Sequence, residues 1–118
     1  MQDFNATVHE FVSLVQQGNF NEALDRFYDE NIVSFENEDQ STQGLQALKE
    51  ETRRFLAATT GLNAEPLNMI ISDDISVVEW HYQFTHARMG VMDYRQVSLQ
   101  RWKNGRIVLE RHHYQTPG

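Results

Sequence analysis

The chain has 118 residues, a formal net charge of −7 at pH 7 and no cysteine. A chain of this length has room for one hydrophobic core, so we expect a single domain over residues 1–118. No apolar run approaches the roughly 20 residues of a membrane-spanning helix, and an acidic surface repels nucleic-acid phosphates, so neither a membrane nor a nucleic-acid partner is expected.

Two amphipathic helices are predicted at the start of the chain. Apolar residues recur at helical spacing over residues 4–15, and the pattern stops before Gly18, which suits a C-terminal cap. A second, shorter helix follows over residues 23–28, with Asn19 as its candidate N-terminal cap. The first part of the chain is therefore helical.

A short β-rich run, "IVSFE", follows these helices over residues 32–36, and the polar segment "NEDQST" after it is interpreted as a loop. Apolar residues at helical spacing over residues 45–56 then predict a third helix that ends before Gly61. Three helices and one strand thus precede residue 61.

Strands dominate the rest of the chain. Four β-like runs are separated by "DD", "MG" and "NG", and the last of these dipeptides is a strong hairpin signal. The order α-α-β-α-β-β-β-β indicates the α+β class, with helices packed on one face of a mainly antiparallel sheet. The four runs cover residues 64–72, 75–88, 91–103 and 106–115.

Several local sequences, in this order, are similar to a known superfamily. The segments "FVSLVQQGNFNEALDRFYDENIVSFEN", "TQGLQAL" and "VSLQRWKNGRIVLERHHY" resemble nuclear transport factor 2-like domains, in particular their SnoaL-like branch. The resemblance implies a cystatin-like cone, in which three N-terminal helices pack on a curved sheet around an internal pocket. Its members include ketosteroid isomerases, polyketide cyclases, dehydratases, epoxide hydrolases and non-catalytic domains, so the fold alone does not define the function.

The resemblance to ketosteroid isomerase gives this chain a candidate catalytic base. The catalytic carboxylate of the isomerase corresponds to Glu36 in this sequence. Partial burial of Glu36 at a pocket wall would raise its pKa and allow it to accept and return a proton. The alternative is a solvated Glu36 at the start of an acidic loop. The isomerase's tyrosine falls on Phe11, which has no hydroxyl, and its protonated aspartate falls on Ser98, which can still donate a hydrogen bond. Proton transfer on a substrate other than a ketosteroid therefore stays open.

His112 is a second candidate for proton transfer. SnoaL-type cyclases use an acidic residue near the end of the last strand, where this sequence has "HHYQ" and the nearest carboxylate is Glu110. A histidine titrates near neutral pH and can replace such an acid, or it can be a polar part of the pocket wall. Strand alternation places Glu110, His112 and Tyr114 on one face and His113 on the other. The resemblance to the isomerase implies that Glu110, His112 and Tyr114 face the pocket.

An aromatic wall completes the predicted pocket. Trp80 and Tyr82 alternate with polar residues in the run over residues 75–88 and are interpreted as inward-facing, with a packed core residue as the alternative for Trp80. Aromatic walls with a few polar groups are typical of small-molecule sites. The predicted site has catalytic Glu36 and His112 and ligand-binding Phe11, Trp80, Tyr82, Ser98, Glu110 and Tyr114.

No metal site or cofactor is expected. The five histidines lack the spacing of a zinc motif, and His112 and His113 point to opposite faces of one strand. We expect a small apolar or aromatic ligand and a homodimer, with Val97 and Leu99 on the convex sheet face as the first place to seek its interface. The absence of a signal-peptide pattern and of cysteine indicates the cytoplasm.

Two functions are compatible with these residues. The first is a cofactor-independent acid–base enzyme, such as an isomerase, cyclase or dehydratase, acting on an apolar or aromatic substrate. The second is a non-catalytic ligand-binding or protein-association domain of the same fold. The sequence does not decide between them, because both require the same pocket.

Overall fold

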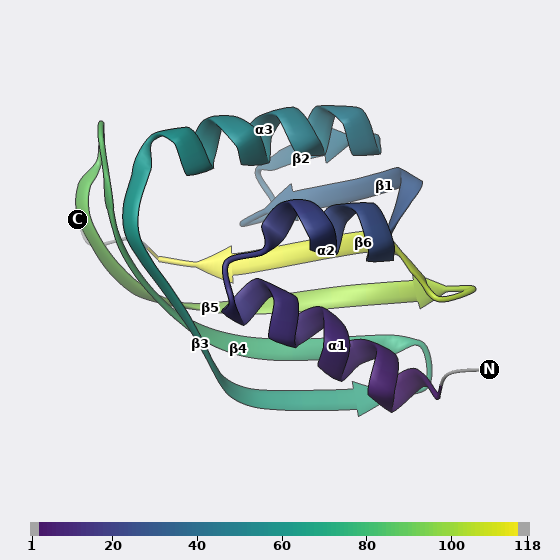
Figure 1. Cartoon of the computed structure of the whole chain (residues 1–118). Coiled ribbons are helices and arrows are strands. Elements are labelled where there is room, and N and C mark those ends of the chain that lie inside the picture. The colour runs from purple at the N-terminus through teal and green to yellow at the C-terminus, as the bar shows by residue number, and fades with distance from the viewer. Residues whose placement is uncertain (1–2, 116–118) are drawn as a thin grey trace.

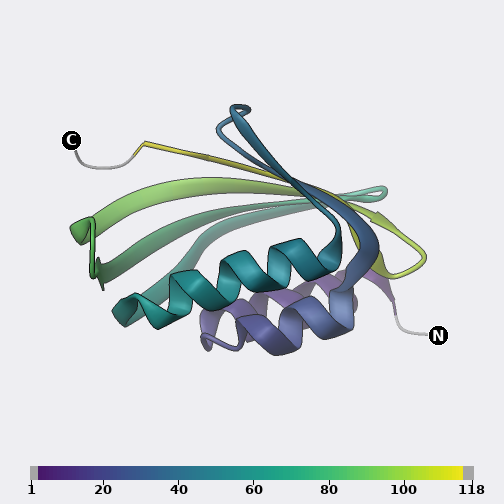
Figure 2. The same cartoon turned by 90° about the horizontal axis from the view of Figure 1, so that it is seen from above.

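Three helices lie on one face of a curved, six-stranded sheet in the computed structural model, which describes residues 3–115 (Figure 1). Figure 2 shows all three helices on the same side of the sheet. The elements in chain order are α1 Phe4–Gln16, α2 Phe20–Phe27, β1 Tyr28–Glu36, β2 Gln40–Gln43, α3 Leu45–Ala57, β3 Thr59–Ser72, β4 Ile75–His86, β5 Gly90–Lys103 and β6 Arg106–Tyr114. The predicted α+β cone is thereby confirmed.

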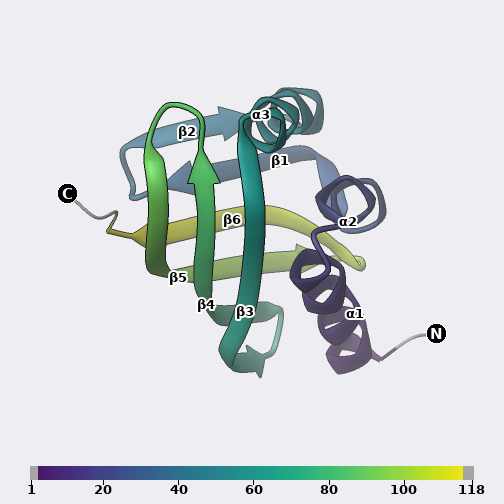
Figure 3. The same ribbon diagram turned by 60° about the vertical axis from the view of Figure 1, so that its left-hand side comes forward.

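The strand order across the sheet is β2-β1-β6-β5-β4-β3. Neighbouring strands are antiparallel except β1 and β6, which are parallel and place Glu36 beside His112. The β3–β4 pairing shifts register between Thr60 and Asn63 and again between Pro66 and Asn68. Such irregularities bend a strand, and Figure 3 shows β3, β4 and β5 curving so that the β4–β5 turn comes up beside α3.

The connection between α1 and α2 follows the predicted glycine but not the predicted cap. Gly18 has a φ of 79°, its N–H donates to Val15, and the Asn19 N–H donates to Leu14, which together form a Schellman motif. Asn19 occupies the N-cap position of α2, but its side chain makes no capping bond and donates to Gln17 instead. The prediction that Asn19 caps α2 is therefore wrong.

The strand β2 was not expected, since its residues were interpreted as part of a polar loop. Asn37 and Glu38 have φ values of 54° and 61° and form a tight turn that brings Gln40–Gln43 back against β1. The strand lies at the sheet edge and is mostly exposed. Its sequence, "QSTQ", has no alternation of apolar and polar residues. Backbone pairing with β1, and not burial of side chains, therefore holds the strand in place.

The core lies at the narrow end of the cone, where α1 and α2 meet the sheet. The Trp102 ring packs edge-to-face on Phe4, Phe11 and Phe27 at centroid distances of 5.7, 5.7 and 6.0 Å. Edge-to-face aromatic packing of this kind stabilises cores beyond the area that it buries. Among residues 3–115, no helix combines the length and apolar character needed to cross a bilayer.

Candidate functional site

A pocket of about 520 Å³ lies between the concave face of the sheet and the helices. The helices α1 and α2 line it with apolar side chains, such as Phe11, Val15 and Leu24, whereas α3 contributes polar Glu51 and Thr52 as well as apolar residues. The strands β1, β5 and β6 line the opposite wall with polar groups. All eight residues of the predicted site contribute to the lining: Phe11, Glu36, Trp80, Tyr82, Ser98, Glu110, His112 and Tyr114.

Glu110 is a buried carboxylate at the centre of the polar wall, with 3% of its surface exposed. The Tyr28 hydroxyl lies 2.7 Å from Oε1 and 2.8 Å from Oε2, and Gln100 Nε2 donates to Oε2 at 2.8 Å. The Nε2 atom of His112 lies 3.2 Å from Oε1. Tyr28 from β1, Gln100 from β5 and His112 from β6 therefore all contact the Glu110 carboxylate. These contacts compensate the large cost of burying its negative charge.

Glu110 and His112 shift each other's pKa in opposite directions. Burial by itself raises the pKa of Glu110, but the charge and hydrogen bond of His112, with the hydrogen bonds of Tyr28 and Gln100, outweigh it and hold this pKa below its usual value. Burial by itself lowers the pKa of His112, but Glu110 and the charge of Glu36 outweigh it and raise this pKa above its usual value. The pair therefore favours a carboxylate beside an imidazolium.

The second ring nitrogen of His112 faces two polar side chains of β5. Its Nδ1 atom lies 2.8 Å from Ser98 Oγ and 3.1 Å from Gln96 Nε2. Gln96 Nε2 also donates to Ser98 Oγ at 3.0 Å. His112 thus connects a buried carboxylate on one side to a serine hydroxyl in the pocket lining on the other.

Further hydrogen bonds anchor this network in the core. The Ser76 hydroxyl donates to Gln100 Oε1 at 2.7 Å, and Trp102 Nε1 donates to Ser76 Oγ at 2.9 Å. Ser76, Gln100 and Trp102 are all buried. Because buried networks of satisfied hydrogen bonds have few alternative arrangements, this network holds the Glu110 side chain in one position.

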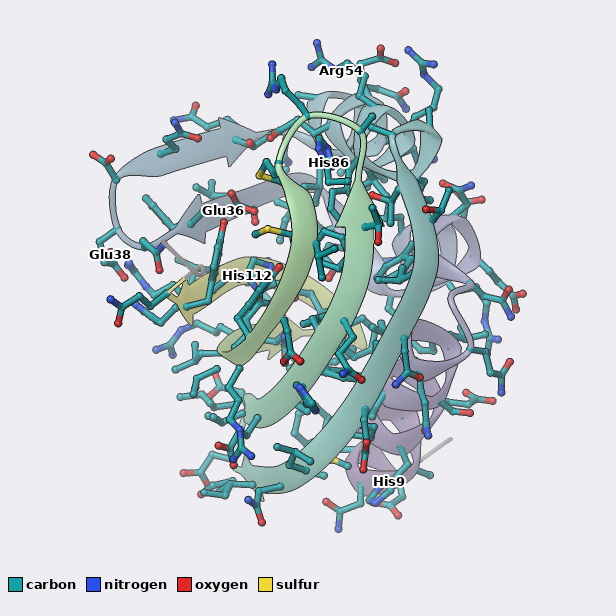
Figure 4. The ribbon with its side chains drawn as sticks, turned by 90° about the vertical axis from the view of Figure 1, so that its left-hand side faces the viewer. His9, Glu36, Glu38, Arg54, His86 and His112 are labelled. Atoms are coloured by element: carbon teal, nitrogen blue, oxygen red, sulfur yellow. The ribbon has the colours of Figure 1, made fainter. Side chains whose placement is uncertain are left out.

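Glu36 lies at the mouth of the pocket and not across it from His112. The two residues are register partners on the parallel strands β1 and β6, and Figure 4 shows them close together. Glu36 is exposed, so the predicted partial burial of this carboxylate is wrong: it is the last residue of β1, next to the turn that leads to β2. It accepts a hydrogen bond of 3.1 Å from the Tyr114 hydroxyl.

The neighbouring histidines have different environments. His112 is partly buried in the pocket wall, whereas His113 is exposed and lies 3.3 Å from Glu38 at the β1–β2 turn. This is the alternation expected from the strand pattern. Among residues 3–115, no group of three or more histidine or acidic side chains is arranged to hold a metal ion.

The family of the chain follows from a comparison with models of known protein families, in which residues 8–110 match the SnoaL-like domain. The chain belongs to the SnoaL-like family. The matched region contains most of α1, all of α2 and α3, and the pocket residues Ser98 and Glu110. A comparison with curated protein sequences finds no significant match.

Solved structures with the same SnoaL-like cone have different assigned activities. A protein from Mesorhizobium loti, assigned to the SnoaL-like polyketide cyclases, is 21% identical with a TM-score of 0.85, covering 96% of this chain and 100% of its own. An epoxide hydrolase from Mycobacterium tuberculosis is 14% identical with a TM-score of 0.75, covering 93% and 80%. A protein from Catenulispora acidiphila with a ketosteroid isomerase-like fold and no assigned activity, solved with trimethylamine, is 13% identical with a TM-score of 0.76, covering 92% of this chain and 85% of its own. At these identities the likeness shows the fold alone.

Three members of the SnoaL-like pocket network are absent from the predicted site: Tyr28, Gln96 and Gln100. The two glutamines share the inward parity of Ser98, so strand alternation provided a signal for them. Tyr28 was placed in the second helix, whereas it is the first residue of β1. Its contact with Glu110, 82 positions away, depends on the parallel pairing of β1 with β6.

The His112–Glu110 pair predicts a pH dependence for the stability of this SnoaL-like domain. Because the folded state raises the pKa of His112, its contribution is complete below the unfolded value of about 6.5 and is lost as pH rises through the folded pKa. We expect the free energy of unfolding to fall as pH rises from the unfolded pKa through the folded pKa, and His112→Gln to make this decrease smaller. Urea denaturation at a series of pH values measures the free energy of unfolding. If it depended on pH in the same way in the variant and the wild type, His112 would not be the group responsible.

Proposed function

We propose that this protein is a cofactor-independent acid–base enzyme that acts on a small apolar or aromatic molecule. The observation that supports this proposal most is the His112–Glu110 pair in the wall of the pocket. A histidine beside a buried carboxylate can hold a proton near neutral pH and return it, which is the requirement for general acid–base catalysis. The assigned cyclase and hydrolase activities of similar structures are compatible with this chemistry.

Each polar residue has a separate role in the proposed reaction. Glu110 is buried and bonded on both oxygens, so it stabilises the imidazolium of His112 and does not itself meet the substrate. Glu36, exposed at the mouth, is the second proton acceptor, and Tyr114 is a hydrogen-bond donor beside it. Isomerase, cyclase and dehydratase reactions of the acid–base type can proceed with such a pair of proton carriers and without a cofactor.

The helical wall indicates the class of substrate. Phe11, Val15 and Leu24 offer only hydrocarbon to the pocket, while Trp80 and Tyr82 provide aromatic surface from β4. Burial of a ligand against this wall favours an apolar or aromatic skeleton, with its polar group directed at His112. A volume of about 520 Å³ is within the range of sites for small organic molecules.

The test of this proposal compares the two neighbouring histidines. A thermal-shift screen of aromatic ketones, lactones and polyketide-like acids first identifies a ligand, because a molecule that binds the native state stabilises it. With that ligand as substrate, we expect His112→Gln to reduce kcat by about 10² or more, whereas His113→Gln leaves kcat unchanged. Equal turnover in the two variants, or a ligand bound without any reaction, would contradict the proposal.

A non-catalytic ligand-binding or association domain is the second candidate. One observation favours it: both ring nitrogens of His112 already contact protein groups, and among the described residues no buried side-chain nitrogen or oxygen lacks a hydrogen-bond partner. A network that is satisfied without a ligand can serve structure alone. The turnover measurement above separates the two candidates.

The proposal includes a homodimer formed through the convex face of the sheet. Ile70, Val77 and Leu99 lie in one row of register partners across β3, β4 and β5, and Val97 is 42% exposed nearby. An apolar row on an exposed face is a common element of interfaces. We expect Val97→Glu to shift the protein toward the monomer in sedimentation-velocity experiments; a wild-type protein that is monomeric at high concentration would contradict the dimer.

A further inference from the structure

Three side chains of the polar wall have the connectivity of a nucleophile, its base and an orienting acid. Ser98 Oγ lies 2.8 Å from His112 Nδ1, and the opposite ring nitrogen lies 3.2 Å from Glu110 Oε1. A hydroxyl bonded to an imidazole that a carboxylate orients is the arrangement that activates serine for covalent catalysis. The acid–base reaction proposed above gives Ser98 no role, so this arrangement allows a further activity.

When His112 is neutral, the surrounding contacts are compatible with the following arrangement of hydrogens. Gln96 Nε2 donates to Ser98 Oγ, which leaves the serine hydrogen free to point at His112 Nδ1. The neutral ring then carries its hydrogen on Nε2 and donates it to Glu110, an acceptor held by Tyr28 and Gln100. In this arrangement the lone pair of Nδ1 accepts from the Ser98 hydroxyl at 2.8 Å, and Gln96 Nε2 also lies 3.1 Å from Nδ1.

We infer that Ser98 is a nucleophile and that the pocket hydrolyses carboxylic esters through an acyl-serine intermediate. Ser98 Oγ attacks the ester carbonyl carbon while its proton passes to His112 Nδ1. The bond from that carbon to the alcohol oxygen then breaks, and the same proton leaves with the alcohol. Water attacks the acyl-serine next, gives a proton to His112, and releases the acid as the serine oxygen recovers its proton.

Two neighbours of Ser98 support this reaction. Gln96 Nε2 lies 3.0 Å from the serine oxygen, so one of its two hydrogens can transfer its bond from Ser98 Oγ to the carbonyl oxygen as that oxygen becomes negative. Glu110 compensates the positive charge that His112 gains during each attack. Both groups are buried side chains of the sheet, so they hold their positions without a bound substrate.

The pocket lining indicates which esters would react. Ser98 itself is only 2% exposed, so the scissile carbonyl has to enter the pocket rather than touch its rim. The apolar helical wall formed by residues such as Phe11 and Leu24 favours a short acyl or aryl group. We therefore expect activity on esters of small apolar or aromatic acids and none on charged or polymeric esters.

Acylation is tested with p-nitrophenyl butyrate and p-nitrophenyl benzoate. We expect a burst of p-nitrophenol equal to the concentration of protein, and an intact mass increased by one acyl group on the peptide that contains Ser98. Ser98→Ala should lose the burst and the adduct, and His112→Gln should slow acylation by about 10² or more. Ser34→Ala is the matched control, because Ser34 also lines the pocket but has no bond to His112 among the described residues.

Other results would overturn the inference. The inference would be wrong if p-nitrophenol were released no faster than in buffer alone. It would also be wrong if the acyl group were found on His112 or a tyrosine, or if Ser98→Ala kept the full burst. If Ser98→Ala does not fold, as judged by circular dichroism, Ser98→Cys replaces it, and its thiol should carry the acyl group. A failed acylation leaves the thermal-shift result and the kcat of His112→Gln in the proposed acid–base reaction unaffected, so the two proposals fail separately.

The rate of acylation should also depend on pH. Only neutral His112 can accept the serine proton, and the carboxylates that face it, Glu110 from its own strand and Glu36 from β1, hold its pKa above the usual value. Acylation is therefore expected to rise as pH increases through that raised pKa. A role of Ser98 restricted to structure would produce no such profile, so a flat rate between about pH 6 and 9 would contradict the mechanism.

Discussion

Glu110→Ala is expected to lower the free energy of unfolding by about 3–5 kcal/mol, the loss typical of breaking one side of a buried ion pair. The substitution removes the acceptor of the Tyr28 hydroxyl and of Gln100 Nε2, and both donors are buried. It also leaves His112 in a partly buried site without its carboxylate. Unfolding in urea at neutral pH measures the change.

The matched control for this prediction is Glu38→Ala. Glu38 also pairs with a histidine, His113, and it contacts Arg111, but its side chain is half exposed. Exposed pairs contribute little because water and salt screen them, so the loss should be about 1 kcal/mol or less. If the two variants lost equal stability, burial would not be the reason for the importance of Glu110.

Trp102→Ala is the second substitution with a large expected effect, about 3–5 kcal/mol of unfolding free energy. The indole ring packs on Phe4 and Phe11 from α1 and on Phe27 from α2, so alanine would leave a cavity between the helices and the sheet. Since α1 and α2 also line the pocket, ligand-dependent stabilisation in thermal-shift measurements should weaken together with the fold.

Trp102→Phe separates the ring from its N–H group. Phenylalanine keeps most of the aromatic packing but cannot donate to Ser76 Oγ, so we expect a smaller loss, about 1 kcal/mol beyond that of the reduced ring. An equal loss for the alanine and phenylalanine variants would mean that the hydrogen-bond network, and not aromatic packing, holds this end of the cone.

Most of the fold was predictable because it depends on local patterns. Helical spacing located α1 and α3, the glycine at position 18 located the end of α1, and the "NG" turn located the β5–β6 hairpin. The strand β2 was not predictable in this way, because a polar edge strand has no apolar period. Its position depends on the turn at Asn37 and Glu38, which pairs it with β1.

The candidate site was predictable only in part, and the carboxylates show where the limit lies. Alternation in the last strand correctly grouped Glu110, His112 and Tyr114 on the face that lines the pocket. It did not indicate that Glu110 is the buried acid and Glu36 the exposed one. Parity states the side of a strand on which a residue lies, but not what covers that side.

The sequence by itself therefore indicated the family through its resemblance to known domains, and it determined the order of the helices and of every strand except β2, and the faces of the last strands, through short-range spacing. Only the tertiary structure showed which acidic residue of the site is buried and which groups shift the pKa of His112 and Glu110. The parallel pairing of β1 with β6 brings Tyr28 to Glu110 and Glu36 beside His112, over more than seventy residues of chain. Burial, ion pairing and pKa depend on such distant neighbours, and no local pattern records them.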